Sequence, residues 1–307
     1  MIYSIRHRTT YAYEKPVGFA RCVLRLTPTA SSTQRLLDSN VIVTPEPATT
    51  VVGRGPFGER TQTILIDKVH NALVIEARSR VDVEVPANEQ LFESNAWEAV
   101  SIAAFGSRVL GVEGPAAHLY PTRRTPPVAA ITDYARLSFG PRRPIIDAVS
   151  ELMKRIYTDF TYNPETTTVS TPAAQAFHAR SGVCQDFAHI MISGLRGLGL
   201  PAAYVSGYLR TNPPPGQPRL AGADATHAWV SVWCGAECGW IGFDPTNDVL
   251  AQNNHIVLAT GRDYSDVAPI DGIILAPGGQ TLKVEVDVVP ESESTVNAGR
   301  ELVSTTA

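Results

Sequence analysis

Short runs of alternating apolar and polar residues fill the first quarter of the chain. They lie at residues 22–26, 63–66, 72–75 and 81–85. Alternation with a period of two puts one side of a strand against a core, and the proline and glycine residues between positions 45 and 56 mark turns. The pattern predicts an antiparallel β-sandwich domain over residues 1–86.

Beyond this domain the pattern changes twice. Residues 87–143 are mixed in character, and prolines such as Pro126 and Pro127 argue against one long regular element, so we expect a connecting region with short helices. Apolar residues then recur at three- and four-residue steps over residues 145–156, which predicts a helix with one buried side.

A second helix is predicted at residues 184–198, where apolar residues again form a stripe. Ser181 is a good N-cap residue for it, which would place Cys184 at the third helical position. Gly199 would end the helix. The sequence thus puts a cysteine in the first turn of a buried helix.

Three strands are predicted after this helix, at residues 202–209, 226–233 and 240–244, with a loop at 212–218. Together with the helices they predict an α+β core over residues 144–270. The last part, residues 271–307, holds an apolar run and a strand-like stretch at 281–288. Beyond Pro290 it is polar, and we expect it to fray.

The place of Cys184 has a chemical interpretation. The first turn of a helix presents unpaired N–H groups and a partial positive charge, and both favour the thiolate, which is the nucleophilic form of cysteine. The Cys184 N–H could also donate to an oxyanion during acyl transfer. The alternative is a small buried residue on the apolar stripe, because cysteine is often buried.

A nucleophilic cysteine needs a base, usually histidine, and a group that orients the base. The last two predicted strands resemble the arms of a hairpin. A two-residue turn at Gly235-Ala236 would place His227 directly opposite Asp244, within reach of a hydrogen bond. A register shifted by two would make the pair diagonal and still reachable. Such pairs also occur as structural surface pairs.

Other polar residues near the helix have simpler interpretations. His189 lies well around the helix from Cys184 and points away from it. Asp186 is early in the helix, where a carboxylate suits the helix dipole. His178 lies in the loop before the helix and could help to line a site, but its sequence context offers no partner.

The remaining histidines and cysteines give weak signals. The two in the β domain, His7 and His70, are isolated, and each is expected to be exposed or hydrogen-bonded; the segments of His118 and His255 have no predicted place. Cys234 and Cys238 lack the two further ligands that a zinc site would need, and a disulfide between them would require an oxidising setting.

Composition narrows the function classes. The chain has 307 residues, of which 44% are apolar and 18% are charged, and its formal net charge is −4, so nucleic acid is not an expected partner. No segment has the roughly 18 consecutive apolar residues of a membrane span. The start alternates like a strand and lacks a secretory apolar core. We therefore expect a cytoplasmic protein with reduced cysteines and no membrane partner.

Four motifs resemble the bacterial transglutaminase-like family, whose members often bear the label of cysteine proteases. They are Ser-Gly-Val-Cys-Gln-Asp-Phe-Ala-His at residues 181–189, Gly-Leu-Pro-Ala-Ala-Tyr-Val-Ser-Gly-Tyr at 199–208, Thr-His-Ala-Trp-Val at 226–230 and Gly-Phe-Asp-Pro-Thr at 242–246. Their order and spacing match the family. The His-x-Thr-x-Tyr-x-Tyr stretch that begins at His7 is similar to the β domain that precedes its core.

The resemblance implies a papain-like core, in which a cysteine on a helix packs against an antiparallel sheet that carries histidine and aspartate. Carried onto this chain, Cys184 is the nucleophile, His227 is the base and later the acid, and Asp244 orients His227. Trp229 would line the acyl pocket, although a strand tryptophan more often belongs to the core. No calcium ligands are evident, and we expect no cofactor and no metal.

These residues predict acyl transfer through a thioester on a peptide or protein substrate. Water as the second reactant gives a protease or amidase, and an amine gives a transglutaminase; the triad is the same for both. We favour hydrolysis because water is always present. Two alternatives are a non-catalytic peptide- or protein-binding module and a structural subunit that docks through the β domain. The sequence indicates neither the natural substrate nor the oligomeric state.

Overall fold

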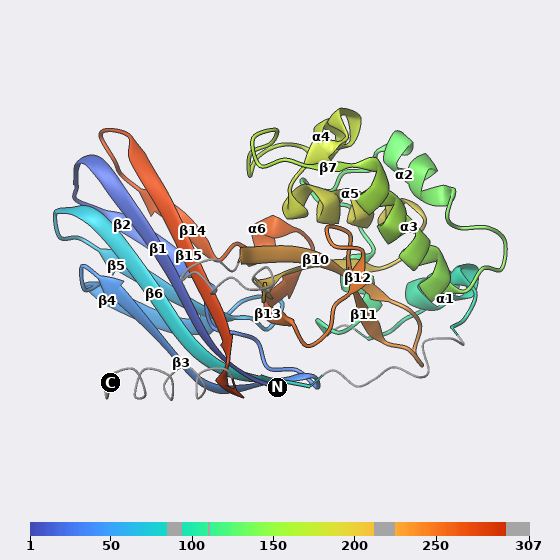
Figure 1. The fold of residues 1–307 in the computed structure, drawn as a ribbon, viewed down its shortest axis with the longest axis horizontal. Coiled ribbons are helices and arrows are strands. Elements are labelled where there is room, and N and C mark those ends of the chain that lie inside the picture. Colours follow the sequence, from blue (N-terminus) through green and yellow to red (C-terminus); the bar gives the residue numbers. More distant parts are fainter. Residues whose placement is uncertain (85–93, 110, 212–224, 293–307) are drawn as a thin grey trace, which may run out of the picture.

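The computed structural model describes residues 1–84, 94–109, 111–211 and 225–292, so the loop expected at 212–218 lies outside the described residues. Two bodies make up the molecule (Figure 1): a β domain of long strands, and a core in which helices cover one side of a sheet. This is the α+β architecture that the sequence predicts.

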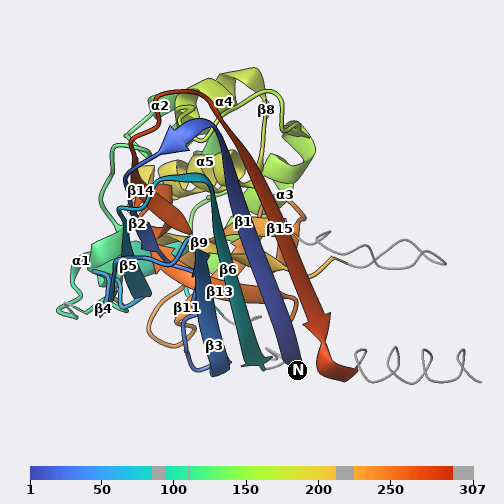
Figure 2. The same ribbon diagram turned by 90° about the vertical axis from the view of Figure 1, so that its left-hand side faces the viewer.

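Two four-stranded sheets form the β domain. Their orders are β15-β1-β6-β3 and β14-β2-β5-β4. The bounds are β1 (Ile2–Val17), β2 (Ala20–Leu24), β3 (Gln34–Thr44), β4 (Thr49–Arg54), β5 (Arg60–Ile66), β6 (His70–Val83), β14 (Ile270–Ile274) and β15 (Gln280–Pro290). Every pairing within the two sheets is antiparallel. Figure 2 shows β1 between β6 and β15, side by side in one sheet.

Apolar residues on the inner faces of the two sheets close the sandwich. Leu24 and Ile64 from one sheet join Leu73 and Ile75 from the other in a single buried cluster. Alternate positions of β6 are buried, as a period of two requires. The predicted sandwich is confirmed, although residues 72–75 and 81–83 of two predicted runs belong to one strand, β6.

Helices make up one layer of the core. They are α1 (Trp97–Phe105), the 3₁₀ turn η2 (Pro115–His118), α2 (Ala129–Arg136), α3 (Ile145–Asp159), α4 (Ala173–Ala179), α5 (Cys184–Gly197) and α6 (Tyr264–Val267). The helix expected at 145–156 is α3, extended by three residues. The helix expected at 184–198 is α5, which is buried along almost its whole length.

The other layer of the core is a sheet of order β12-β11-β10-β9-β13. Its strands are β9 (Ala202–Leu209), β10 (Ala225–Trp233), β11 (Trp240–Asp244), β12 (Val249–Leu250) and β13 (His255–Gly261). Alternate residues of β10, namely Ala228, Val230 and Val232, pack into the cluster that α5 also enters. The odd-numbered residues of β10 therefore face away from the main body of α5. A short parallel pair, β7 (Thr161–Tyr162) with β8 (Ser181–Gly182), leads into α5.

The β domain and the core are joined by the chain itself and by hydrogen bonds. After β13 the chain returns to the β domain, where β14 pairs with β2 and β15 pairs with β1. Gln34 of β3 exchanges hydrogen bonds with the backbone of Val257 in β13. His7 of β1 is hydrogen-bonded to the Tyr208 hydroxyl of β9 at 2.9 Å. Within the residues that the structure describes, no helix is long and apolar enough to cross a membrane.

Candidate active site

Cys184 is the first residue of α5. The predicted N-cap was wrong: Ser181 pairs with Thr161 in the parallel ladder, which keeps the chain extended, and Val183 is the N-cap instead. The thiol consequently lies two positions closer to the helix start than expected. A first-position N–H has no acceptor within the helix, so the Cys184 N–H can point towards a ligand at this end. The Cys184 side chain is half-buried.

Asp186 fixes the start of α5 from within the first turn. Its Oδ2 accepts hydrogen bonds from the Val183 N–H at 2.9 Å and from the Thr167 hydroxyl at 2.6 Å. Burial raises the pKa of Asp186, and these two hydrogen bonds oppose that shift. A Cβ at Gly182 would lie 2.6 Å from Oδ2, so only glycine fits there. The helix-start role predicted for Asp186 is confirmed.

His227 and Asp244 come from neighbouring strands, but in a different register from the one predicted. Trp233 pairs with Trp240, so the connection is a six-residue loop, and the predicted turn at Gly235-Ala236 is wrong. The register is shifted by two, and Asp244 lies diagonally across from His227. The pair nevertheless forms, and His227 Nε2 lies 2.8 Å from Asp244 Oδ2.

The His227 ring links Cys184 to Asp244. Because a carboxylate can only accept, His227 Nε2 carries the proton towards Asp244, and Nδ1 is left for the thiol. Burial alone would lower the pKa of His227, but hydrogen bonds to Asp244 and Cys184 and the attraction of both groups raise it to about 10. Of the three side chains named from the sequence, His227 therefore contacts the other two, with its imidazole between the Cys184 sulfur and the Asp244 carboxylate.

Asp244 is fully buried and is held by five hydrogen bonds. Its Oδ1 accepts from the backbone N–H groups of Thr246 and Asn247. Its Oδ2 accepts from His227, from the Asn247 side chain at 2.7 Å and from His255 Nε2 at 3.1 Å. Burial would raise the pKa of Asp244, but these donors hold it well below the usual range. The carboxylate therefore stays charged although no water reaches it.

Sequence reasoning missed two members of this cluster, Asn247 and His255. His255 lies at the first residue of β13, and no local motif marks it as a partner of Asp244. Its position near Asp244 depends on the long-range pairing of β13 with β9, which no local sequence pattern indicates.

The Trp229 side chain packs beneath His227. The two rings stack with centroids 6.1 Å apart, and Trp229 is only 2% exposed. Its indole edge lies over Gly207, where a Cβ would come within 2.6 Å of the ring. These contacts give Trp229 a packing role, and its predicted contact with the acyl group of a substrate stays a prediction.

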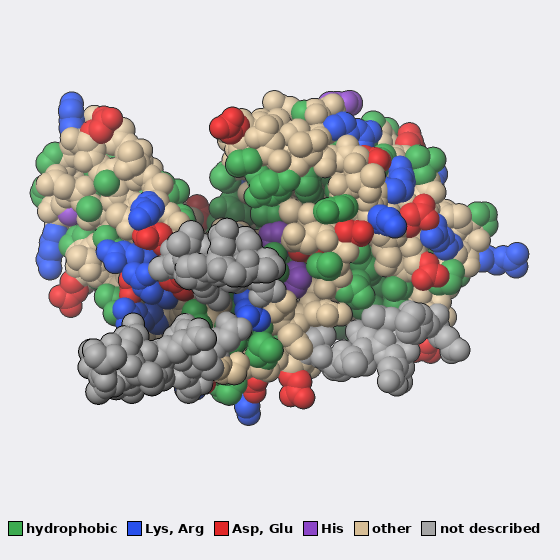
Figure 3. All heavy atoms as spheres, viewed as in Figure 1, with side chains coloured by type: hydrophobic (Ala, Val, Ile, Leu, Met, Phe, Trp, Pro, Cys, Tyr) green, Lys and Arg blue, Asp and Glu red, His purple; other side chains and the backbone are tan. Residues whose placement is uncertain are grey.

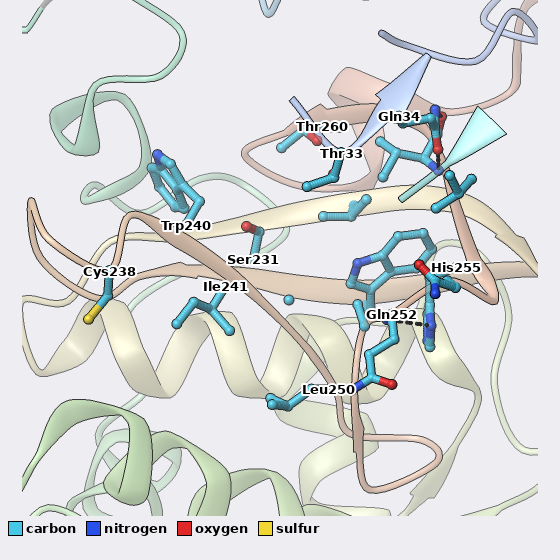
Figure 4. Close-up of a pocket in the computed structure, with 17 residues that line it drawn as sticks. Thr33, Gln34, Ser231, Cys238, Trp240, Ile241, Leu250, Gln252, His255 and Thr260 are labelled. Atoms are coloured by element: carbon cyan, nitrogen blue, oxygen red, sulfur yellow. Dashed lines mark hydrogen bonds between the residues drawn. The ribbon is translucent and has the colours of Figure 1, made fainter. Parts of the chain in front are cut away.

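A pocket of about 590 Å³ lies on the face of the core sheet that carries Trp229 and His255 (Figure 4). Both bodies contribute to it, with Gln34 from β3 and Ser231 from β10. None of the described residues that line it is Asp, Glu, Lys or Arg. His255 stands in its wall, where the Gln252 backbone N–H donates to its Nδ1 at 3.3 Å.

The remaining histidines lie apart from the thiol. Tyr264 donates its N–H to His189, whose ring contacts that of Tyr204 at a tilted angle. His178 lies on α4 and is exposed. His118 is buried against Phe57 and Trp240. Both β-domain histidines are hydrogen-bonded, as predicted: His7 to Tyr208 and Thr9, and His70 to the Lys68 carbonyl.

One cluster has the composition of a metal site. The nitrogen and oxygen atoms of His227, Asp244 and His255 lie within 4.8 Å of one another. Both imidazole N–H groups point at Asp244 Oδ2, so a metal ion would have to displace the protons that hold the carboxylate. Hydrogen bonding accounts for this cluster. Cys234 and Cys238 are free thiols.

The surface is hollowed between the β domain and the core (Figure 3). Histidine side chains are visible at the floor of this hollow, and apolar side chains gather on its core side.

Two family models match the chain. Residues 3–82 match the bacterial transglutaminase-like N-terminal region, and residues 133–245 match the transglutaminase-like superfamily. The chain belongs to the bacterial transglutaminase-like family. The motifs that carried the resemblance lie within or beside these matches, and the fold agrees with it.

Several curated proteins are similar to this chain in sequence. An uncharacterised protein of Mycobacterium tuberculosis is 41% identical over 297 residues, covering 94% of this chain and 92% of that protein. A second, from Mycobacterium leprae, is 32% identical over 286 residues, covering 92% of this chain and 96% of that protein. A protein-glutamine gamma-glutamyltransferase of Pseudomonas aeruginosa is 31% identical over 162 residues, which are 49% of this chain and 23% of that protein.

The fold also has a counterpart among solved structures. A protein of Cytophaga hutchinsonii, provisionally described as a cysteine protease, superimposes with a TM-score of 0.71 and 24% identity, covering 94% of this chain and 91% of that one. At this identity the likeness speaks for the fold alone. The transglutaminase-like fold is typical of cysteine hydrolases and acyltransferases.

Proposed function

We propose that the protein is a cysteine-dependent acyl-transfer enzyme that cleaves amide bonds in peptides or proteins through a thioester. One observation carries the proposal: the thiol at the first residue of α5 contacts an imidazole whose other nitrogen is held by a buried carboxylate. Membership of the transglutaminase-like superfamily supports the same chemistry.

The first half-reaction forms the thioester. Cys184 Sγ, as the thiolate, attacks the amide carbon, and the carbonyl oxygen gains negative charge beside the Cys184 N–H. The tetrahedral intermediate collapses as the carbon–nitrogen bond breaks. His227, which carries the proton while Asp244 is charged, gives that proton to the leaving amine.

The second half-reaction releases the acyl group. The neutral His227 takes a proton from water, and the resulting hydroxide attacks the thioester carbon. The carbon–sulfur bond then breaks, which returns the thiolate and the imidazolium to their starting states. Asp244 keeps its charge and its contact with His227 Nε2 throughout.

The proposal is tested by labelling Cys184 with a limiting amount of alkylating agent across pH, with peptide mapping to separate it from the other cysteines. An activated pair predicts fast, selective labelling near neutral pH that is lost in His227→Ala. Equal and slow labelling of both proteins would instead favour a non-catalytic binding module.

Amine transfer is a second candidate, favoured by the likeness to the Pseudomonas aeruginosa protein-glutamine gamma-glutamyltransferase. An amine would then replace water in the second half-reaction. Incubation of glutamine-containing peptides with and without a primary amine separates the two outcomes. A peptide whose mass rises by that of the added amine less ammonia marks transfer, and cleavage or deamidation marks hydrolysis.

A further inference from the structure

His255 contacts the carboxylate that orients the proposed base. Its Nε2 lies 3.1 Å from Asp244 Oδ2, the same oxygen that binds His227. Both side chains are buried, since His255 is 7% exposed and Asp244 is 0% exposed. Two imidazoles from strands β10 and β13 therefore converge on one oxygen from β11.

The hydrogen-bond partners fix the protonation of His255. A carboxylate can only accept, so His255 Nε2 must carry a hydrogen. The Gln252 N–H donates to Nδ1, which must therefore be the unprotonated nitrogen (Figure 4). His255 is a neutral imidazole whose donor is aimed at Asp244. This ring acts as a fixed donor and takes no proton from the thiol, which it does not touch.

The second role of His255 is to separate Asp244 from the pocket behind the sheet. His255 lines that pocket, whereas Asp244 does not. The imidazole thus stands between the carboxylate and a polar space large enough to admit water. Without this barrier, water would compete with His227 for the hydrogen bonds of the Asp244 carboxylate.

We infer that His255 is a positioning residue, which holds Asp244 charged and oriented for His227 by donating to Oδ2 and by closing the pocket side. The inference rests on the proposed function, in which Asp244 orients the base. It explains why a single oxygen carries the hydrogen bonds of both imidazoles and of Asn247.

The expected consequence is a change in the pH profile. With fewer donors the charged form of Asp244 is less favoured, and its pKa rises towards the usual range. The rate of Cys184 labelling rises with pH and then reaches a plateau, and we call the rising part the acid limb. In the variant the acid limb should move to higher pH by about one unit, and the plateau rate should fall by about tenfold. A residue with a purely structural role would change the stability of the protein without moving this limb.

The variants form a matched set. His255→Gln places an amide donor near the position of Nε2, whereas His255→Asn carries the same amide one methylene short of Oδ2. His255→Phe fills the space without a donor. His70→Phe removes a buried strand histidine of the β domain and serves as the control. Each full-length protein is checked for folding by thermal unfolding before labelling.

The inference predicts that the Gln variant labels like the wild type, that Asn and Phe show the shifted limb, and that the control is unchanged. It is overturned if Asn or Phe keeps the wild-type profile, or if Gln is as impaired as Asn. Should Phe fail to fold, the Gln and Asn pair still decides.

Failure of the proposed function has a different signature, because the wild type itself would then lack fast labelling. In that case the downfield NMR resonance of the His227 Nε2 proton decides the inference. The proton signal should persist in wild type and Gln and disappear or move upfield in Asn. An unchanged resonance in Asn would show that His255 does not hold Asp244.

Discussion

Two histidines in this molecule are buried to a similar degree and have opposite electrostatics. His7, at the junction of the two bodies, is 2% exposed, and burial lowers its pKa to about 4. His227, in the candidate active site, is 8% exposed, yet its pKa is raised to about 10. Both rings have polar partners, so the number of hydrogen bonds does not explain the difference.

The charge of the partner explains it. His7 is bonded to the hydroxyl groups of Tyr208 and Thr9, which are neutral and can serve either nitrogen. His227 faces a buried carboxylate on one side and a thiol on the other. With neutral partners the buried His7 ring stays neutral, whereas His227, between the Asp244 carboxylate and the Cys184 thiol, holds a proton that it can give to a leaving group.

The largest expected effect comes from removing that anion. Asp244→Asn keeps the shape of the side chain and makes the surroundings of His227 resemble those of His7. Acyl transfer should fall roughly 10³–10⁴-fold, as in other triads that lose their carboxylate. Peptide hydrolysis rates measure this, with Asp133→Asn on the exposed side of α2 as the control. Activity within tenfold of the wild type would contradict the proposed role.

A second test uses the pH dependence of stability. The pKa of His227 is raised from 6.5 to about 10, so its contribution is fully present below the unfolded value and is lost as pH rises through the folded value. The thermal unfolding midpoint of the wild type should therefore drop more between about pH 6 and pH 10 than that of His227→Gln. Parallel curves would show that the ring carries no extra proton in the folded state.

The corresponding change at the junction should affect stability alone. His7→Phe leaves the Tyr208 hydroxyl without its partner in a site where that ring is 1% exposed. The free energy of unfolding should fall by about 1–3 kcal/mol, the cost of an unsatisfied buried group. Denaturant titration measures the loss. A changed rate of Cys184 labelling would mean that the junction is coupled to the active site.

The smallest effect is expected from Thr9→Val, which removes only one of the two partners of His7. The lost hydrogen bond, 3.0 Å long, should cost about 0.5–1.5 kcal/mol. The same titration detects it. If Thr9→Val lowers the free energy of unfolding as much as His7→Phe does, the stabilisation comes from the hydrogen bond to Thr9 and not from the one to Tyr208.

Sequence reasoning reached the parts of the site that have local signatures. Cys184 stands beside a helix start, while His227 and Asp244 stand on two strands close enough in sequence to pair. The predicted hairpin register was wrong because backbone hydrogen bonds close a longer loop, from the Cys234 N–H to the Gly239 carbonyl and from the Gly239 N–H to the Gly235 carbonyl, and side-chain patterns do not reveal them. The predicted N-cap was wrong because Ser181 pairs with Thr161, 20 residues earlier, in a two-stranded parallel sheet.

His255 shows where such reasoning ends. Its strand, β13, pairs with β9, which lies more than 40 residues earlier in the chain. No pattern in the sequence around His255 predicts that its ring contacts Asp244 of β11 in that sheet. The side chains on the helix and the hairpin were predictable because their geometry is local, whereas the support behind them depends on how the whole sheet assembles.

The return of β14 and β15 to the first domain bears on the order of biosynthesis. Six strands leave the ribosome early, but β1 and β2 still have open edges until residues 270–290 emerge, after the entire core. Open edges invite pairing with other chains. An excised fragment ending near residue 86 should therefore be prone to self-association, and a fused β14–β15 segment should restore its solubility.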